Sequence, residues 1–120
     1  MLFGDGGDDI IKGAGTNTVL SGGSGNDKLY AHDFAGDSND WQMVYFGGPG
    51  HDLIKAGSSE DKIYGGPGDD RIYGGYGSDE IWGGEGDDYI YFENDTVANS
   101  KYGEADVHGG PGDDHILAGS

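Results

Sequence analysis

A period of nine residues constrains the fold of this chain more than any other feature of its sequence. Residues 47–91 divide into five successive blocks that keep one register: GGPGHDLIK, AGSSEDKIY, GGPGDDRIY, GGYGSDEIW and GGEGDDYIY. Blocks on the same template are assigned at residues 3–11, 12–20, 22–30 and 109–117, with Ser21 as a one-residue insertion. Self-similarity at a fixed short period is the signature of a repeat protein.

The blocks also define the expected domain organisation. Residues 35–40 match the AGxSxD form of residues 56–61, so they are assigned as a further loop, followed by a longer strand at Trp41–Phe46. We expect one elongated domain over residues 1–120 that is a fragment of a longer repeat array. Its repeats lie at 3–30, 35–91 and 109–117, with interruptions near 31–46 and 92–108.

Each position of the block has a preferred residue type. Positions one, two and four are mostly Gly, which permits the positive φ angles of a tight loop. Positions seven to nine alternate outward, inward, outward, and a strand that buries one side chain is stable only when it stacks on neighbours. The sequence therefore predicts an all-β parallel coil with two short strands per turn. The expected inward residues are Ile10, Val19, Leu29, Ile54, Ile63, Ile72, Ile81, Ile90 and Ile116.

Stacking the turns brings acidic side chains together. Loops eighteen residues apart become neighbours, which pairs Asp52 with Asp70, Asp61 with Asp79, and Asp70 with Asp88. Two carboxylates about 5 Å apart repel by roughly 3 kcal/mol at an effective dielectric of 20. The chain has 23 Asp/Glu against 6 Lys/Arg and a net charge of −17, so such a fold requires cations. Carboxylate and carbonyl oxygens on flexible loops suit several Ca²⁺ ions better than Mg²⁺.

The composition excludes several other classes of protein. A chain with a pI of about 4.1 is a poor partner for nucleic acid. It contains no apolar stretch long enough to span a membrane. The absence of Cys removes disulfides and thiolate metal sites. No arrangement of Ser, His and Asp has a supporting catalytic motif, so we expect no enzyme activity and no catalytic residues.

The nonapeptide itself is similar to a known family. The block Gly65–Tyr73, GGPGDDRIY, resembles the RTX nonapeptide repeat of secreted bacterial toxins, proteases, lipases, epimerases and adhesins. The resemblance implies a right-handed parallel β-roll that binds Ca²⁺ between its turns. It also implies a chain that is unfolded in the low-Ca²⁺ cytoplasm and folds after export, hence an extracellular or cell-surface location.

The resemblance further implies a set of calcium ligands. The side-chain ligands would be the sixth residues of the blocks, with Asn17 as a weaker half-site and Asp40 by a weaker match: Asp8, Asn17, Asp27, Asp40, Asp52, Asp61, Asp70, Asp79, Asp88 and Asp114. The loop carbonyls would come from Gly4, Gly6, Gly22, Gly47, Gly48, Pro49, Gly50, Ala56, Gly57, Ser58, Ser59, Gly65, Gly66, Pro67, Gly68, Gly74, Gly75, Tyr76, Gly77, Gly83, Gly84, Glu85, Gly86, Gly109, Gly110, Pro111 and Gly112.

Three functions are compatible with these features. The first is a calcium-binding structural module of a secreted protein that folds on binding Ca²⁺ outside the cell. The second is a self-associating repeat of an extracellular filament or adhesin, because segments that begin at Phe46 and His108 repeat across 62 residues. The third is the C-terminal secretion or folding region of a secreted hydrolase or toxin. Copies of the chain, end to end or laterally, would be partners in the second case.

Aromatic residues at the ninth position leave a further question open. Tyr64 and Trp82 are expected on one sheet face, and Tyr73 and Tyr91 on the other. Such rows either stabilise the sheet by stacking or present a surface for a neighbouring domain or a glycan.

Overall fold

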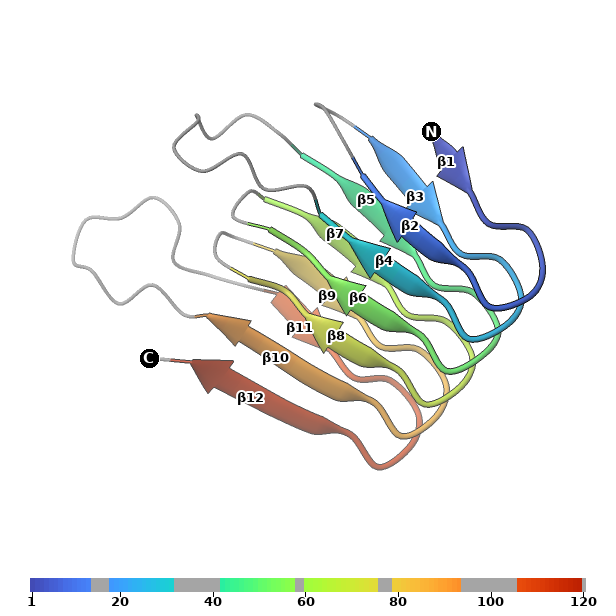
Figure 1. The fold of residues 1–120 in the computed structure, drawn as a ribbon. Helices are drawn as coiled ribbons and strands as arrows, with labels where there is room; N and C mark the ends of the chain where they lie inside the picture. Colours follow the sequence, from blue (N-terminus) through green and yellow to red (C-terminus); the bar gives the residue numbers. More distant parts are fainter. Residues whose placement is uncertain (14–17, 32–41, 58–59, 76–78, 94–105, 120) are drawn as a thin grey trace.

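The chain folds as a flattened coil of short strands joined by tight loops (Figure 1). The structure is a computed structural model that describes residues 1–13, 18–31, 42–57, 60–75, 79–93 and 106–119. The described ranges contain strands and turns but no helix. Successive strands alternate between two layers, so each turn of the coil contributes one strand to each layer.

The two layers are six-stranded parallel sheets. The odd sheet has the order β1-β3-β5-β7-β9-β11, and the even sheet has the order β12-β10-β8-β6-β4-β2. The odd sheet consists of β1 (Leu2–Phe3), β3 (Val19–Ser21), β5 (Val44–Phe46), β7 (Lys62–Tyr64), β9 (Glu80–Trp82) and β11 (Asp106–His108). The even sheet consists of β2 (Ile10–Lys12), β4 (Lys28–Tyr30), β6 (Leu53–Lys55), β8 (Arg71–Tyr73), β10 (Tyr89–Glu93) and β12 (His115–Gly119). The predicted all-β parallel roll with two short strands per turn is confirmed.

The core is a double column of single side chains between the sheets. Each three-residue interior strand points its middle residue inward, β10 points its second residue inward, and the central members of the column are fully buried. The column consists of Ile11, Leu20, Leu29, Tyr45, Ile54, Ile63, Ile72, Ile81 and Ile90. Ile116 was expected to belong to it, but its side chain is 45% exposed because β12 lies at the end of its sheet and pairs only with β10.

The register predicted for residues 3–20 was wrong by one residue. Ile10 is 67% exposed, whereas Ile11 is buried and pairs with Leu29 of β4. In the same way Leu20, not Val19, is fully buried. The first two repeats therefore begin at Gly4 and Gly13, and Ser21 is the ninth residue of its repeat rather than an insertion.

The interruption near 31–46 contains a shorter strand than predicted. The strand expected at Trp41–Phe46 is β5, Val44–Phe46, whose middle residue Tyr45 is buried. Trp41 and residues 32–40 lie outside the described ranges. The second interruption lies between β10 and β11, and the structure describes both of these strands.

Candidate metal centre

The loops lie along two edges of the roll that differ in acidity. The first edge consists of the loops that lead into even-sheet strands, at the right of Figure 1. The sixth residue of all its loops is Asp, at Asp9, Asp27, Asp52, Asp70, Asp88 and Asp114. The second edge consists of the loops that lead into odd-sheet strands. The corresponding described residues there are Thr18, Met43, Asp61 and Asp79, so only two adjacent turns are acidic.

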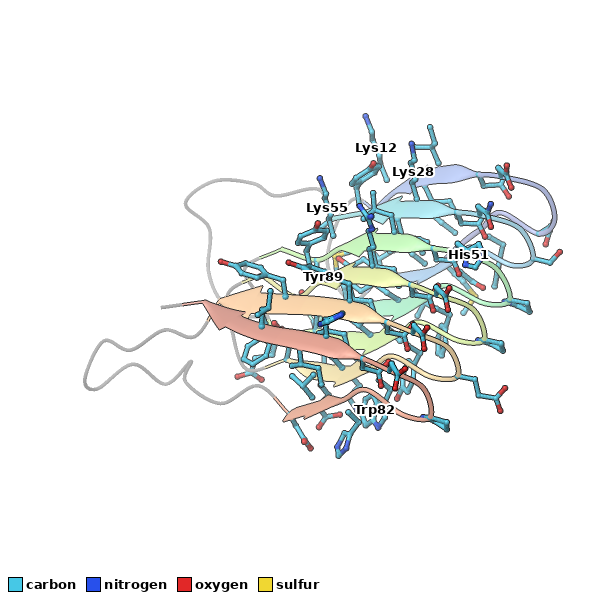
Figure 2. All side chains as sticks on the ribbon, turned by 90° about the horizontal axis from the view of Figure 1, so that it is seen from below. Lys12, Lys28, His51, Lys55, Trp82 and Tyr89 are labelled. Carbon is cyan, nitrogen blue, oxygen red and sulfur yellow. The ribbon has the colours of Figure 1, made fainter. Side chains whose placement is uncertain are left out.

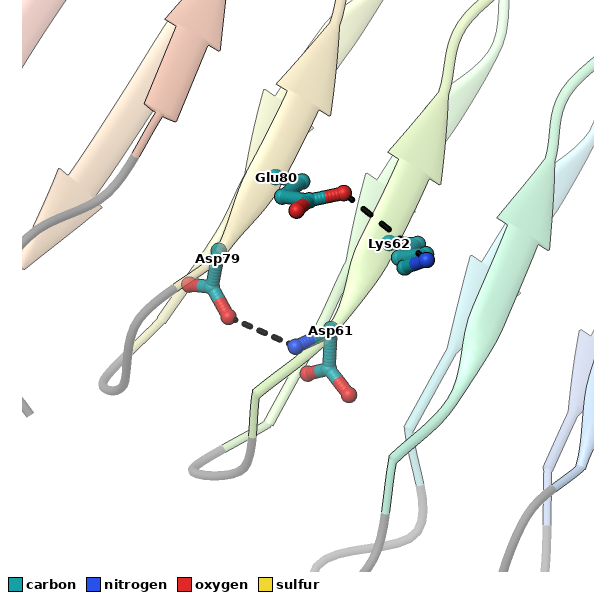
Figure 3. Close-up of polar contacts among 4 residues, drawn as sticks. All are labelled: Asp61, Lys62, Asp79 and Glu80. Carbon is teal, nitrogen blue, oxygen red and sulfur yellow. Dashed lines mark hydrogen bonds and ion pairs between the residues drawn. The ribbon is translucent and has the colours of Figure 1, made fainter.

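The carboxylates of the first edge form a ladder with the backbone. Oδ1 of Asp70 accepts a hydrogen bond from the backbone N–H of Asp52 at 2.8 Å, and Oδ1 of Asp88 accepts from Asp70 at 2.9 Å. The same contact joins Asp9 to Asp27, Asp27 to Asp52, and Asp88 to Asp114. On the second edge, Figure 3 shows Oδ1 of Asp79 accepting from the N–H of Asp61 at 3.0 Å. One carboxyl oxygen of Asp27, Asp52, Asp70, Asp79, Asp88 and Asp114 is thus fixed by the preceding turn, whereas Asp9 joins the ladder through its backbone N–H.

The other carboxylate oxygen is buried and has no hydrogen-bond partner. This holds for Oδ2 of Asp9, Asp27, Asp52, Asp70, Asp79 and Asp88. A buried polar atom without a partner is rare in a folded protein, and a buried anionic oxygen is stable only beside a cation or with a proton. The row of Oδ2 atoms therefore requires positive charge along the edge.

Loop carbonyls complete the oxygen-rich surroundings. The carbonyls of loop positions one and three accept hydrogen bonds from the preceding turn, as in Gly48 N–H to Gly65 O and Gly50 N–H to Pro67 O, both 3.0 Å. Apart from the carbonyl of Asp5, which accepts from the N–H of Ser24 at 2.9 Å, the carbonyls of positions two and four, such as those of Gly48 and Gly50, accept no backbone hydrogen bond from residues that the structure describes. They remain available as ligands for a hard cation.

Close stacking explains the glycines at position two. Gly48 has a φ of 96°, and a Cβ added to it would collide with the carbonyl oxygen of Gly23 in the preceding turn. The first loop has Asp5 at this position with a φ of 77°, the only described residue other than Gly with a positive φ. No described turn precedes that loop, so the side chain of Asp5 has space that the later loops lack.

Burial makes these carboxyls reluctant to ionise. Desolvation, the largest cause, raises the pKa of Asp70 and of Asp79 from 3.8 to about 8. It also raises the pKa of Asp52 and of Asp88 to about 6. The hydrogen bond from the preceding turn opposes this shift, and neighbouring carboxylates add to it, such as Asp52 and Asp88 around Asp70. The ionised form at neutral pH therefore needs a compensating cation.

The donor set fits Ca²⁺. No group of three or more His, Cys, Asp or Glu side chains converges among the described residues, so side chains alone do not form a cage. Each gap between turns instead offers carboxylate oxygens from two loops together with backbone carbonyls. Ca²⁺ accepts six to eight such oxygens in variable geometry, whereas the soft metals prefer sulfur or nitrogen ligands.

The structure places the predicted ligands unequally. Asp27, Asp52, Asp61, Asp70, Asp79 and Asp88 are buried at the edges, and Asp114 is partly buried. The predicted pairs of Asp52 with Asp70, Asp61 with Asp79, and Asp70 with Asp88 are adjacent, as expected. Among the predicted carbonyl donors, Ser58, Ser59, Tyr76 and Gly77 lie outside the described ranges.

The corrected register changes three of the predicted side chains. Asp8 is exposed, and Asp9 occupies the position equivalent to Asp27. Asn17 and Asp40 lie outside the described residues. The sixth positions of their turns are Thr18 and Met43, because Val44 pairs with Lys62 and the N–H of Met43 donates to Oδ1 of Asp61.

A second ladder at position five was not predicted from the sequence. Oδ1 of Asp87 accepts from the N–H of Asp113, and Oδ1 of Asp69 accepts from Asp87, both at 2.8 Å. Nδ1 of His51 accepts from Asp69 at 3.0 Å in the same row. These side chains are exposed, so they clamp adjacent loops from outside. The repeated Asp-Asp doublets were the sequence signal for two parallel rows.

The ninth-position aromatic residues divide between the two sheets as predicted. On the odd sheet Tyr64 stacks on Phe46 at 5.0 Å and on Trp82 at 4.8 Å, with interplanar angles of 8° and 5°. Trp82 in turn stacks on His108 at 5.9 Å. Because neighbouring rings cover the faces of Tyr64 and Trp82, this row is a stabilising stack.

Comparison with known proteins agrees with this geometry. A family model described as the RTX calcium-binding nonapeptide repeat (4 copies) matches residues 1–20, 13–33, 46–75, 64–96 and 103–120. The resemblance predicted from the nonapeptides is thus confirmed, and repeats of this type bind several Ca²⁺ ions per set. Neither a curated protein nor a solved structure gives a significant match. Among the described residues, no helix has the length and apolar character needed to cross a membrane.

Proposed function

We propose that this chain, which belongs to the RTX calcium-binding nonapeptide repeat family, is a module of a secreted protein that folds when it binds Ca²⁺ outside the cell. RTX repeats occur in secreted proteins. The observation that carries the proposal is the row of buried Oδ2 atoms without partners. A fold that gathers these oxygens is unfavourable without cations, so the binding free energy of Ca²⁺ becomes folding free energy.

We assign the calcium ligands mainly to the first edge. Its side-chain ligands are Asp9, Asp27, Asp52, Asp70, Asp88 and Asp114, with Asp61 and Asp79 on the second edge. Asp9 replaces Asp8 in this assignment because Oδ2 of Asp9 is buried without a hydrogen-bond partner, whereas Asp8 is exposed. Five gaps between the turns of the first edge and one gap between Asp61 and Asp79 give about six ions. Six divalent ions would reduce the charge of −17 to about −5.

The test is a calcium titration followed by far-ultraviolet circular dichroism and by calorimetry. The chain should be largely unfolded in EDTA, gain β structure in millimolar Ca²⁺, and bind about six ions. Absence of any β gain between EDTA and Ca²⁺ would exclude the proposal. Mg²⁺ at the same concentration should give a much smaller gain, because it prefers a strict octahedron and retains its waters.

Matched variants locate the sites. Asp70→Asn removes a charged ligand from the buried row and should raise the Ca²⁺ concentration needed for folding. Asp69→Asn, one residue away on the exposed row, should change it little. Equal effects of the two substitutions would show that general acidity, and not the buried ladder, determines binding.

End-to-end self-association is less well supported than the folding module. A Cβ added to Gly23 would collide with the carbonyl oxygen of Asp5 in the preceding loop. Asp5 occupies the equivalent position of the first loop, so its Cβ would collide in the same way with a turn stacked in front of that loop. Stacking of another turn on the first loop would therefore need Gly in place of Asp5. The length of particles formed by this chain in Ca²⁺, measured by electron microscopy, should not increase with protein concentration.

A further inference from the structure

The outer face of four strands of the even sheet, β2, β4, β6 and β8, is basic in an otherwise acidic chain. The basic face is defined by the outward residues of β2, β4, β6 and β8: Ile10, Lys12, Lys28, Tyr30, Leu53, Lys55, Arg71 and Tyr73. It includes four of the six Lys and Arg residues of the chain and no Asp or Glu. Figure 2 shows Lys12, Lys28 and Lys55 projecting on the same side of the roll, with Trp82 on the opposite side.

The cations on this face are evenly spaced. Strand pairing gives one row in the order Lys12, Tyr30, Lys55, Tyr73 and a second row in the order Lys28, Leu53, Arg71. Cations of one row are two strands apart, which corresponds to roughly 9.5 Å. Nζ of Lys55 lies 5.9 Å from the ring centre of Tyr30 and 5.6 Å from that of Tyr73. Like charges are thereby kept apart by aromatic rings.

The tyrosines of the even sheet are arranged differently from the stack on the odd sheet. Tyr73 lies 6.4 Å from Tyr89 and 6.3 Å from Tyr91, at interplanar angles of 52° and 55°. Tilted rings do not cover each other's faces. A groove of about 450 Å³ is lined on its sheet side by Arg71, Tyr73 and Tyr89 and on its loop side by Asp69, Asp70 and Asp87, which lie in the proposed calcium loops. It continues into a groove of about 400 Å³ that is lined on the sheet by Lys28, Lys55 and again Arg71, with Asp27, Asp52 and Asp69 along its loop side.

We propose that the basic face binds a linear polysaccharide that carries carboxylate groups. Aromatic faces pack against sugar rings, and the planar guanidinium of Arg71 matches a carboxylate in a bidentate pair. The spacing of cations within a row is about the length of two linked sugars, so a carboxylate on every second sugar would match it. The inference rests on the proposed function, because strand pairing in the calcium-bound roll brings these side chains together.

The experiment measures binding of hyaluronan oligosaccharides, which carry one carboxylate on every second sugar, by isothermal titration calorimetry in Ca²⁺. The intact chain should bind them and should not bind neutral dextran. Replacing Lys12, Lys28 and Lys55 by Gln should weaken binding about twofold to fivefold each, as expected for exposed ion pairs. The matched control is Lys62→Gln, which removes an outward cation from the odd sheet where Lys62 faces Glu80 at 3.9 Å.

Each result decides the proposal. Binding that is lost in the triple Lys→Gln variant and kept in Lys62→Gln supports it. Equal binding by those two variants, or equal binding of dextran, overturns it. Tighter binding of dextran sulfate or of single-stranded DNA than of hyaluronan also overturns it, since the ligand would then be a sulfated or phosphate polymer. Circular dichroism of each variant in Ca²⁺ reports folding separately, so loss of glycan binding by a folded roll leaves the calcium function intact.

Discussion

Protons should substitute for Ca²⁺ in folding this chain. The buried carboxyls have a higher pKa in the metal-free roll than in the unfolded chain, where the ordinary value is 3.8. A group of this kind stabilises the fold fully below its unfolded pKa and loses that contribution as the pH rises through its folded pKa. Without Ca²⁺, stability should therefore increase as the pH is lowered from about 8 toward 4.

The expected magnitude is large. With a pKa of about 8, Asp70 and Asp79 each lower the stability of the metal-free roll by roughly 4 kcal/mol at pH 7. Asp52 and Asp88, with a pKa of about 6, each contribute roughly 3 kcal/mol in the same direction. The four contributions together are roughly 14 kcal/mol, which is near the upper end of the stability of a typical small domain, about 5–15 kcal/mol. The metal-free roll should thus be unfolded at neutral pH.

Circular dichroism in calcium-free buffer between about pH 7.5 and 5 tests this linkage. The β signal should appear on acidification, while in millimolar Ca²⁺ it should already be present at pH 7.5. Asp70→Asn cannot ionise, so its metal-free folding should begin at a higher pH than that of the natural sequence, with Asp69→Asn as the exposed control.

Two outcomes would refute the reasoning. A calcium-free chain that is fully folded at pH 7.5 would show that the buried carboxyls do not oppose folding. An acidified chain that never gains β structure would show that the cations contribute more than charge neutralisation, for example by fixing loop geometry. Either result would show that the cost of ionising the buried carboxyls is not the main reason why folding requires Ca²⁺.

Three further changes have defined outcomes in Ca²⁺. Gly48→Ala should destabilise the roll, measured by urea unfolding, about 1–3 kcal/mol more than Gly7→Ala, because the two glycines share a φ near 97° but only Gly48 lies against a preceding turn. Asp9→Asn should remove roughly one bound ion in calorimetry, whereas Asp8→Asn should remove none; the reverse would restore the register predicted from the sequence. Trp82→Ala should lower the free energy of unfolding by about 2 kcal/mol through loss of its stack, and no change would show that the aromatic row is not stabilising.

The register of the roll could be predicted wherever a single apolar residue stands between polar neighbours. In Arg71-Ile72-Tyr73 only Ile72 can be the inward residue, and it is fully buried. In the first repeat, Asp8-Asp9 and Ile10-Ile11 are doublets, so a shift by one residue leaves the pattern almost unchanged. The pairing of Ile11 with Leu29 decides between the two registers, and a pairing between residues of different turns cannot be predicted from the local sequence.

The same limit applies to the ligands of the second edge. Residues 35–40 fit the loop template, yet Val44, Tyr45 and Phe46 are all apolar, so alternation does not reveal which of them points inward. The pairing of Tyr45 with Ile63 fixes the inward residue and assigns the sixth position to Met43. The repeats therefore predicted the existence and type of the metal sites, whereas their exact residues depended on contacts between turns.

The two edges of the roll differ in how repulsion between stacked carboxylates at the sixth position is avoided. On the first edge a continuous row of Asp needs cations, so the proposed function makes folding conditional on Ca²⁺. On the second edge, Met43 is 6% exposed at an equivalent position, and the hydroxyl of Tyr45 donates to its Sδ at 3.4 Å. Replacing buried charges by well-packed apolar groups is commonly neutral or stabilising, so this turn does not depend on an ion. In the proposed module, calcium control is therefore concentrated on the first edge, next to the groove of the basic face, whereas apolar packing replaces a buried carboxylate on the second edge.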